Sequence, residues 1–282
     1  MASLRDCCEG LGVGAAHPKF VRRDNLVVSP QRVHQRAASE RMSRTLINGA
    51  GRARYQAHVP LRAPERLLVA ADAALRAIRD PREARMVGVL GETTGKPALS
   101  RMLKRMEQHP MGRAVLRDRP VITSTSMPIE WLRAMPSDSL GAAYAGFLQA
   151  HSFDPDERSV VQFVDDPDLA YVMTRYRQVH DLWHVLYALP PSLLGEVALK
   201  WLEAVQTGLP MCGLAAVGGG LRLKLKQRTI VRQHILPWVA RQLTSRVDLM
   251  SVYYEREMEK PLSLLRQELG VELVPNVSQA GS

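Results

Sequence analysis

The chain has 282 residues, of which 46% are hydrophobic and 23% charged, a composition that excludes wholesale disorder. Its three cysteines exclude a disulfide framework, and their spacing excludes a thiolate zinc site, which indicates a reducing compartment. The 38 basic residues outnumber the 28 acidic ones, giving a net charge of +10. With only 5% aromatic residues and no recognised binding motif, we nevertheless expect no nucleic-acid partner.

Residues 1–60 are predicted to form an extension ahead of the folded part. They contain ten Lys and Arg against four Asp and Glu, and so carry +6 of the net charge. Arg-rich, Ser-bearing and acid-poor composition is typical of a mitochondrial or other organellar transit peptide. Asp6 and Glu9 depart from that composition, and a disordered tail is the alternative. No apolar run follows the first charges, so a secretory signal is not expected.

Residues 61–275 are predicted to form one compact all-α domain of several helices. Pro64 opens the first helix, where apolar residues recur at the helical period. No alternation of β-branched residues persists long enough to build a sheet. The residues that carry this first apolar stripe are Leu67, Leu68, Ala71, Leu75 and Ile78. Later helical segments are expected over 99–106, 229–243 and 248–268, with an extended connection over 120–126.

Two helix starts are marked more sharply than the others. Asp166 is the expected N-cap of a long helix, with Pro167 in its first turn. Pro190 and Pro191 end that helical segment, and the next helix is predicted to begin at Ser192. The two helices should therefore form a hairpin.

An uncharged stretch at 204–221 reaches the lower length limit of a membrane-spanning helix. Gln206, Pro210 and five glycines interrupt it, so we predict a buried or interface-lying segment and not a span. The residues that follow suit contact with acidic lipid headgroups, and a solvated charged face is the alternative. Four of them are basic: Arg222, Lys224, Lys226 and Arg228.

Candidate metal ligands are concentrated between residues 180 and 196. His180 and His184 lie one helical turn apart, so their imidazoles share a face and could bind one ion. Asp181 is close enough to join them, and the predicted hairpin could aim Glu196 back at the pair. Two nitrogens and two carboxylates suit zinc, iron or manganese better than magnesium or calcium.

Each of these residues also has a simpler role open to it. A histidine on an apolar stripe is usually a hydrogen-bonded core residue. Glu196 could pair with Lys200, or favour the N-terminus of its own helix. Spacing alone leaves the metal site and these structural roles evenly balanced.

The same residues carry a resemblance to a known family. His180-Asp181-Leu182-Trp183-His184 with Glu196 resembles the metal motif of the mitochondrial ubiquinone (coenzyme Q) biosynthesis family numbered four. The similarity spans about residues 61–273 and includes all four ligand positions. Other agreeing words are Val-Leu-Gly-Glu-Thr-Thr-Gly at 89–95, Phe-Val-Asp-Asp at 163–166, Lys-Trp-Leu-Glu-Ala-Val-Gln-Thr-Gly-Leu-Pro-Met at 200–211 and Tyr-Tyr-Glu-Arg at 253–256.

The resemblance implies an all-α protein, peripheral on the matrix side of the mitochondrial inner membrane, within a multiprotein ubiquinone-making complex. It implies Zn²⁺, with iron or manganese as alternatives, bound by His180, Asp181, His184 and Glu196. The implied activity is a decarboxylase (lyase) reaction on a polyprenylated 4-hydroxybenzoate, of the 4-hydroxy-3-methoxy-5-polyprenylbenzoate type. Asp181 or Glu196 would donate the proton. Expected partners are other ubiquinone-biosynthesis enzymes, the polyprenylated benzoate or quinone intermediate and anionic inner-membrane lipids; a homodimer is left open.

Other functions fit the sequence less well or remain as alternatives. The main alternative is a non-catalytic, lipid-binding scaffold of the same complex with a structural metal. A phosphohydrolase built on a His-Asp doublet is disfavoured, because neither His151 nor Asp248 lies in a matching motif. No Glu-x-x-His pair supports a ferritin-like di-iron protein.

Overall fold

The computed structural model describes residues 53–79, 84–242 and 247–274. The predicted extension at 1–60 lies outside them as far as residue 52, so its role as a transit peptide stays a prediction. Within the described residues the regular elements are helical, with one isolated bridge between Ser139 and Pro261 and no strand. The all-α prediction is confirmed.

The α-helices are α2 (Ala63–Arg79), α3 (Ala84–Thr94), α4 (Lys96–Gln108), α5 (Pro110–Asp118), α6 (Ile129–Arg133), α7 (Leu140–His151), α8 (Pro167–Leu186), α9 (Leu193–Thr207), α10 (Pro210–Gly220), α11 (Leu225–Ile230), α12 (Leu236–Gln242) and α13 (Leu262–Glu268).

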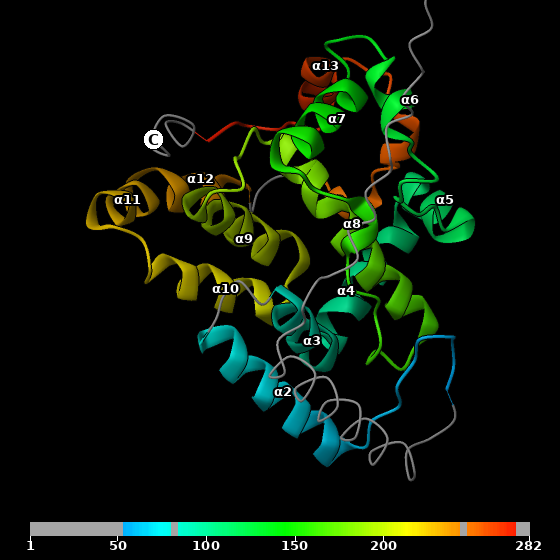
Figure 1. Ribbon diagram of the computed structural model, residues 1–282, viewed down its shortest axis with the longest axis vertical. Helices are drawn as coiled ribbons and strands as arrows, with labels where there is room; N and C mark the ends of the chain where they lie inside the picture. The colour runs from blue at the N-terminus through cyan, green and yellow to red at the C-terminus, as the bar shows by residue number, and fades with distance from the viewer. Residues whose placement is uncertain (1–52, 80–83, 243–246, 275–282) are drawn as a thin grey trace, which may run out of the picture. The chain divides into compact units, whose positions relative to one another are not determined.

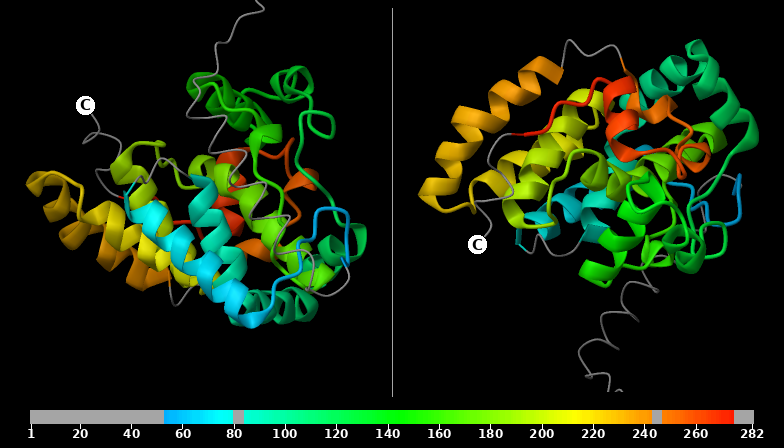
Figure 2. Two further views of the ribbon diagram at one scale, coloured as in Figure 1. Left: turned by 60° about the horizontal axis from the view of Figure 1, so that its bottom comes forward. Right: turned by 90° about the horizontal axis from the view of Figure 1, so that it is seen from above.

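Helix α8 is the longest of the described helices and is largely buried (Figure 1). Of its 20 residues 14 are buried, as expected of a helix that is covered on most sides. Helices α4 and α7 pack against it, while α9 packs against α10 and α12. Helix α3 lies between α2 and α10, and the views of Figure 2 show α2 on the outside of this group.

The two sharply marked helix starts lie where the sequence predicts. The Asp166 carboxylate accepts hydrogen bonds from the backbone N–H groups of Asp168 (2.8 Å) and Leu169 (3.2 Å). These bonds satisfy two of the donors that the start of α8 would leave unpaired. The Ser192 hydroxyl accepts from the N–H of Gly195 (3.3 Å) and caps α9 in the same way.

The connection between α8 and α9 brings the start of α9 unusually close to the preceding chain. Ala188 adopts a left-handed backbone conformation (φ 52°) where α8 ends. A Cβ on Gly195 would lie 1.9 Å from the carbonyl oxygen of Pro190, so only glycine fits there. This close approach sets the position of Glu196, the next residue along α9.

The apolar stripe predicted for the first helix does not face the core. Leu67, Leu68 and Leu75 of α2 are 72%, 69% and 55% exposed. The helix is buried instead through Ala70 and Ala73, on the side that packs against α3. Small side chains allow two helices to approach closely, and this decides which face of α2 is covered.

The prediction of one continuous helix over residues 248–268 is wrong. The segment forms two short 3₁₀ turns, Leu249–Ser251 and Tyr254–Arg256, before α13 begins after Pro261. The fully buried Arg175 of α8 draws this segment inward by an ion pair with Glu255 and a hydrogen bond to the carbonyl of Val252 (3.1 Å). A buried guanidinium is costly unless it is paired, so the contacts of Arg175 outweigh the local helix propensity of this segment.

The uncharged stretch at 204–221 forms the end of α9 and all of α10. Gly208, with a φ of 68°, ends α9 and allows the chain to turn into Pro210. Across the described part of the chain, no helix combines the length and the apolar character needed to cross a bilayer.

Candidate metal centre

Three of the four predicted ligands meet between α8 and α9. His180 and His184 come from the second half of α8, and Glu196 comes from the first turn of α9. One potential ligand atom from each lies within 4.8 Å of the other two. The Nε2 atom of His184 is 3.0 Å from Glu196 Oε1, and that of His180 is 3.8 Å from Glu196 Oε2.

The hydrogen bonds of the two histidines direct their Nε2 atoms toward Glu196. The Nδ1 atom of His184 lies 3.0 Å from the carbonyl oxygen of Leu189, which can only accept, so Nδ1 carries the proton. The Nδ1 atom of His180 lies 2.6 Å from the Glu203 carboxylate, with the same consequence. Each neutral imidazole is left with a lone pair on Nε2.

The resulting donor set fits a metal ion. The Nε2 atom of His184 is buried and makes no hydrogen bond to any described residue, although a carboxylate oxygen lies 3.0 Å away. Two nitrogen lone pairs and a carboxylate that face one another need a cation between them, either a proton or a metal ion. A metal ion held by two imidazoles and one carboxylate meets that need, with each imidazole N–H bonded to an oxygen behind it.

The fourth predicted ligand, Asp181, is engaged elsewhere in the structure. Its carboxylate pairs with Arg158, whose guanidinium also donates to the Tyr144 hydroxyl (3.2 Å). Both partners of the pair are only 17% exposed. Asp181 does not join the group formed by the other three, and its assignment as a ligand stays a prediction.

A functional residue that sequence reasoning missed is Glu203. Its side chain is completely buried behind His180. The Lys200 ammonium, which the sequence paired with Glu196, instead donates to Glu203 (2.7 Å). The available signal was helical spacing, because residues 196, 200 and 203 follow one another on one face of α9. Nothing in the sequence indicated Phe147, whose ring stacks on that of His184 at 5.5 Å.

The surrounding charges hold Glu196 ionised. Burial acts to raise its pKa, but the neighbouring His184 and the charges of His180 and Lys200 outweigh burial and bring the pKa to about 2. Burial and the Lys200 charge act to lower the pKa of His180, but Glu203 and Glu196 raise it overall. Without metal, a proton on His180 can balance Glu196, and a binding metal ion would displace that proton.

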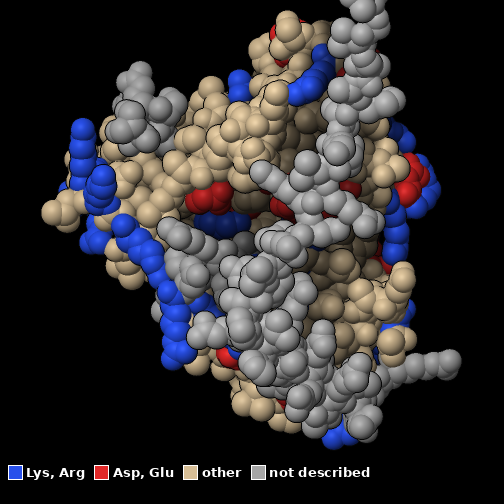
Figure 3. Space-filling view, in the orientation of Figure 1, with Lys and Arg blue, Asp and Glu red and all other residues tan. Residues whose placement is uncertain are grey.

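The site is accessible from one side. The side chains of Glu196 and His180 are 35% and 21% exposed, while His184 is at 1%. Figure 3 shows acidic and basic side chains together in a hollow beside α9. The partial exposure of Glu196 and His180 leaves the candidate site open to solvent on that side.

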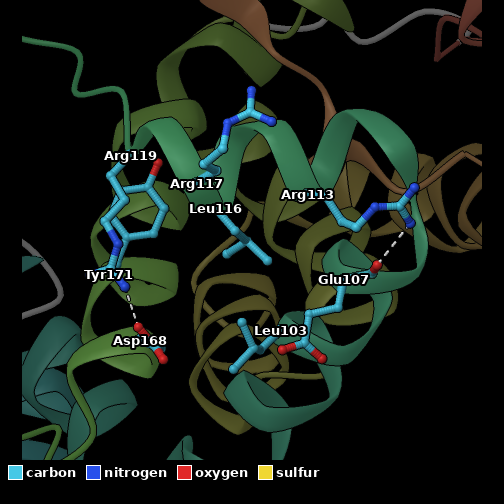
Figure 4. Close-up of a pocket in the computed structure, with 8 residues that line it drawn as sticks. All are labelled: Leu103, Glu107, Arg113, Leu116, Arg117, Arg119, Asp168 and Tyr171. Carbon is cyan, nitrogen blue, oxygen red and sulfur yellow. Dashed lines mark hydrogen bonds and ion pairs between the residues drawn. The ribbon is translucent and has the colours of Figure 1, made fainter.

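A separate open groove has a volume of about 350 Å³ and is away from these ligands. It lies between helix α5, the C-terminal half of α4 and the first turn of α8. Its sides carry Arg113 and Arg119, and its floor includes Leu116 (Figure 4). Arg119 pairs with Asp168, and Arg113 donates to the carbonyl of Glu107 (3.2 Å). The groove holds none of the predicted site residues, and its arginines are already engaged.

The fold and the site together define an all-α protein in which a helical hairpin presents a candidate two-histidine, one-carboxylate metal centre. The family predicted from the sequence motif is confirmed by comparison. The chain belongs to the coenzyme Q (ubiquinone) biosynthesis protein Coq4 family, whose sequence profile matches residues 55–275. This membership supports a role in ubiquinone biosynthesis.

Several curated relatives cover most of the chain. It is similar to the mitochondrial ubiquinone biosynthesis protein COQ4 homologue of Bos taurus, at 42% identity over 78% of this chain and 83% of the relative. The Rattus norvegicus homologue is 39% identical over 89% of this chain and 96% of the relative. The Homo sapiens homologue is 40% identical over 86% of this chain and 91% of the relative.

The fold also has a counterpart among crystal structures. A candidate ubiquinone biosynthesis protein from Nostoc punctiforme superposes with a TM-score of 0.56, at 18% identity. The match covers 73% of this chain and 98% of the other. At that identity the likeness shows a shared fold alone.

Proposed function

We propose that the protein is a metal-dependent carbon–carbon lyase that removes the carboxyl group from a polyprenylated 4-hydroxybenzoate, of the 4-hydroxy-3-methoxy-5-polyprenylbenzoate type. The observation that carries the proposal is the convergence of His180, His184 and Glu196, while Asp181 is held by Arg158. Three protein ligands with a position left for substrate or water are typical of catalytic zinc sites, whereas structural zinc sites have four protein ligands.

The proposed metal is zinc, with iron or manganese as alternatives that the same donors would also bind. His180, His184 and Glu196 would hold it, while Asp181, the fourth ligand predicted from the sequence, is paired with Arg158 and would leave a position open. Bound there, the metal would supply a Lewis acid that polarises the oxygen-bearing head group of the substrate.

The protein's own groups would bind the ring and manage the proton. A hydroxyl para to the carboxyl group feeds electrons into the ring. A proton added at the carboxyl-bearing carbon then allows the carbon–carbon bond to break, which releases carbon dioxide and leaves hydrogen in its place. Asp181 and Glu196 are the predicted donors. The Phe147 ring stacks on His184 and also contacts the rings of His151 and Phe153, so it would hold the His184 imidazole in place.

The decarboxylation is tested by assaying purified, metal-analysed protein on a polyprenylated 4-hydroxybenzoate and following carbon dioxide. We expect carbon dioxide release that a chelator removes and one of the three metals restores. No release with zinc, iron or manganese from protein that binds metal stoichiometrically would contradict catalysis. It would favour the alternative, a lipid-binding scaffold with a structural metal.

We infer that the protein works at the matrix side of the mitochondrial inner membrane, attached peripherally, and helps to organise a complex of ubiquinone-biosynthesis enzymes. The mammalian relatives carry mitochondrial names. The proposed contact with anionic lipid is the segment from α10 to α11, hereafter the α10–α11 surface. Its exposed apolar side chains are Leu214, Val217, Leu221 and Leu225, at 50–80% exposure. Its basic residues, all exposed, are Arg222, Lys224, Lys226 and Arg228.

Neutralising two lysines of this surface is expected to weaken binding to anionic vesicles about thirtyfold. Each basic residue near such a membrane contributes about 1 kcal/mol, so Lys224→Gln with Lys226→Gln should remove about 2 kcal/mol. Flotation with phosphatidylserine-containing vesicles measures the loss, and high salt should release the wild type because it screens the attraction.

The matched control is Lys96→Gln with Lys104→Gln, two exposed lysines of α4. This variant has the same net charge as the first, but its changes lie outside the α10–α11 surface. Equal weakening in both variants would show that only net charge matters and would contradict this placement of the membrane contact.

A further inference from the structure

A second carboxylate lies immediately behind the candidate metal ligands, and the proposed reaction does not use it. Glu203 lies two turns after Glu196 on α9 and is completely buried. Its Oε1 atom is 2.6 Å from Nδ1 of His180. Its Oε2 atom accepts from the Tyr176 hydroxyl and the Lys200 ammonium, each at 2.7 Å.

Folding alone does not explain this arrangement. Removing a carboxylate and an ammonium from water carries a large desolvation penalty, and apolar residues of similar volume often stabilise a protein as well or better. Both oxygens of Glu203 nevertheless have partners, and within the cluster of Glu203, Tyr176, His180 and Lys200 the side chains of His180 and Lys200 are 21% and 18% exposed, while the other two are buried. Because the buried ion pair of Glu203 and Lys200 lies directly behind His180, we infer that it acts on that histidine.

Glu203 can determine which nitrogen of His180 faces the site. A carboxylate only accepts hydrogen bonds, so Nδ1 of His180 must donate and the lone pair of its neutral ring must lie on Nε2. That nitrogen is the one that faces Glu196. Lys200 and Tyr176 hold Glu203 from the other side, so the carboxylate cannot turn away without losing both.

We propose that Glu203 is the positioning residue for the metal ligand His180, and that Lys200 and Tyr176 position Glu203 in turn. The inference rests on the metal site of the proposed function and extends it to a second layer of residues. His184 has a backbone carbonyl in the equivalent place, so the two ligands differ. A carboxylate behind an imidazole increases its basicity as well as orienting it, and such partners typically account for a 10- to 100-fold effect on metal affinity.

The test compares two double variants that both remove the buried charges. Lys200→Met with Glu203→Gln keeps an acceptor for Nδ1 of His180, and Lys200→Met with Glu203→Met removes it. Neither leaves an unpaired buried charge. We expect the second to bind Zn²⁺ 10- to 100-fold more weakly than the wild type in competition with a chelating dye. The first should stay within about fivefold, and the visible spectrum of bound Co²⁺ should change only in the second.

The matched control removes another buried ion pair of α8. Arg177→Met with Glu92→Gln eliminates a pair whose partners are 12% and 2% exposed and which does not contact the metal ligands. This control should bind Zn²⁺ as the wild type does. Equal loss in the two double variants at residues 200 and 203, or no loss in either, would overturn the positioning role. A wild type that binds no Zn²⁺ would instead overturn the proposed metal site.

A measurement on the wild type keeps the inference testable if the methionine variant does not fold. Nitrogen-15 NMR of histidine-labelled protein with Zn²⁺ reports which ring nitrogen carries the proton. We expect the proton of His180 on Nδ1 and the metal on Nε2. A proton on Nε2 of His180 would overturn the proposal even though metal is bound.

Discussion

Replacing His184 or His180 with alanine is expected to abolish stoichiometric metal binding. Structural zinc sites with four protein ligands bind with an apparent free energy of about 10–16 kcal/mol, or about 3 kcal/mol per ligand, and we expect a similar contribution from each ligand here. Losing it should cost at least about a hundredfold in affinity. Metal content after dialysis measures the effect. Circular dichroism should show most of the helicity intact, because a domain of this size does not need a metal to fold.

A neighbouring histidine provides the control. His151 at the end of α7 is exposed, and its ring contacts Phe147 and not the three converging ligands. His151→Ala should keep its metal. If His184→Ala retained one metal ion per chain, the site formed by α8 and α9 would not be the binding site.

The same measurement decides the role of Asp181. The sequence motif predicts that Asp181→Asn loses metal, whereas the ion pair with Arg158 favours a structural role for this carboxylate. Loss equal to that of His184→Ala would establish Asp181 as the fourth ligand. Retention would leave three protein ligands and an open position, which is the arrangement that catalysis requires.

Glu196→Gln is expected to lower decarboxylation by about 10²- to 10⁴-fold while changing substrate binding much less. Glutamine has nearly the same shape, but it removes the charge that faces the two Nε2 atoms. With a pKa of about 2, Glu196 is ionised near neutral pH, so it must take up a proton before it can donate one to the ring carbon. Turnover and the dissociation constant of the substrate should be measured separately, together with metal content.

Glu107→Gln, on the exposed side of α4, is the matched control and should leave turnover unchanged. A scaffold predicts a different result for Glu196→Gln: assembly with partner enzymes would weaken, and the isolated wild type would show no turnover to lose. Comparable losses of substrate binding and turnover would show that Glu196 acts in binding and would contradict the role proposed for it.

Several features of the fold were predictable because their causes are local in the chain. The starts of α8 and α9 depend on one side chain and the backbone within three residues of it, at Asp166 and Ser192. The shared face of His180 and His184 follows from helical geometry alone. The predicted hairpin already directed Glu196 toward the histidines, and its approach requires the turn after Pro190 and the absence of a side chain at Gly195.

Other features depended on residues far apart in the sequence. The spacing of α2 could not show that its alanines, and not its leucines, would be covered. The buried Arg175 recruits Glu255, 80 residues later, and prevents the long helix predicted there. Asp181 is next to His180 in sequence, yet its partner Arg158 comes from the connection between α7 and α8.

By itself, therefore, the sequence determined the all-α class, the helical hairpin, the two histidines of the candidate centre and the family to which the chain belongs. Only the tertiary structure showed where the carboxylates around that centre lie. Glu203 contacts Nδ1 of His180, Glu196 faces both histidines, and Asp181 pairs with Arg158. The physical reason is that a buried or half-buried charge takes whichever partner the packed helices place within reach, and helix packing brings together residues whose separation along the chain carries no such information.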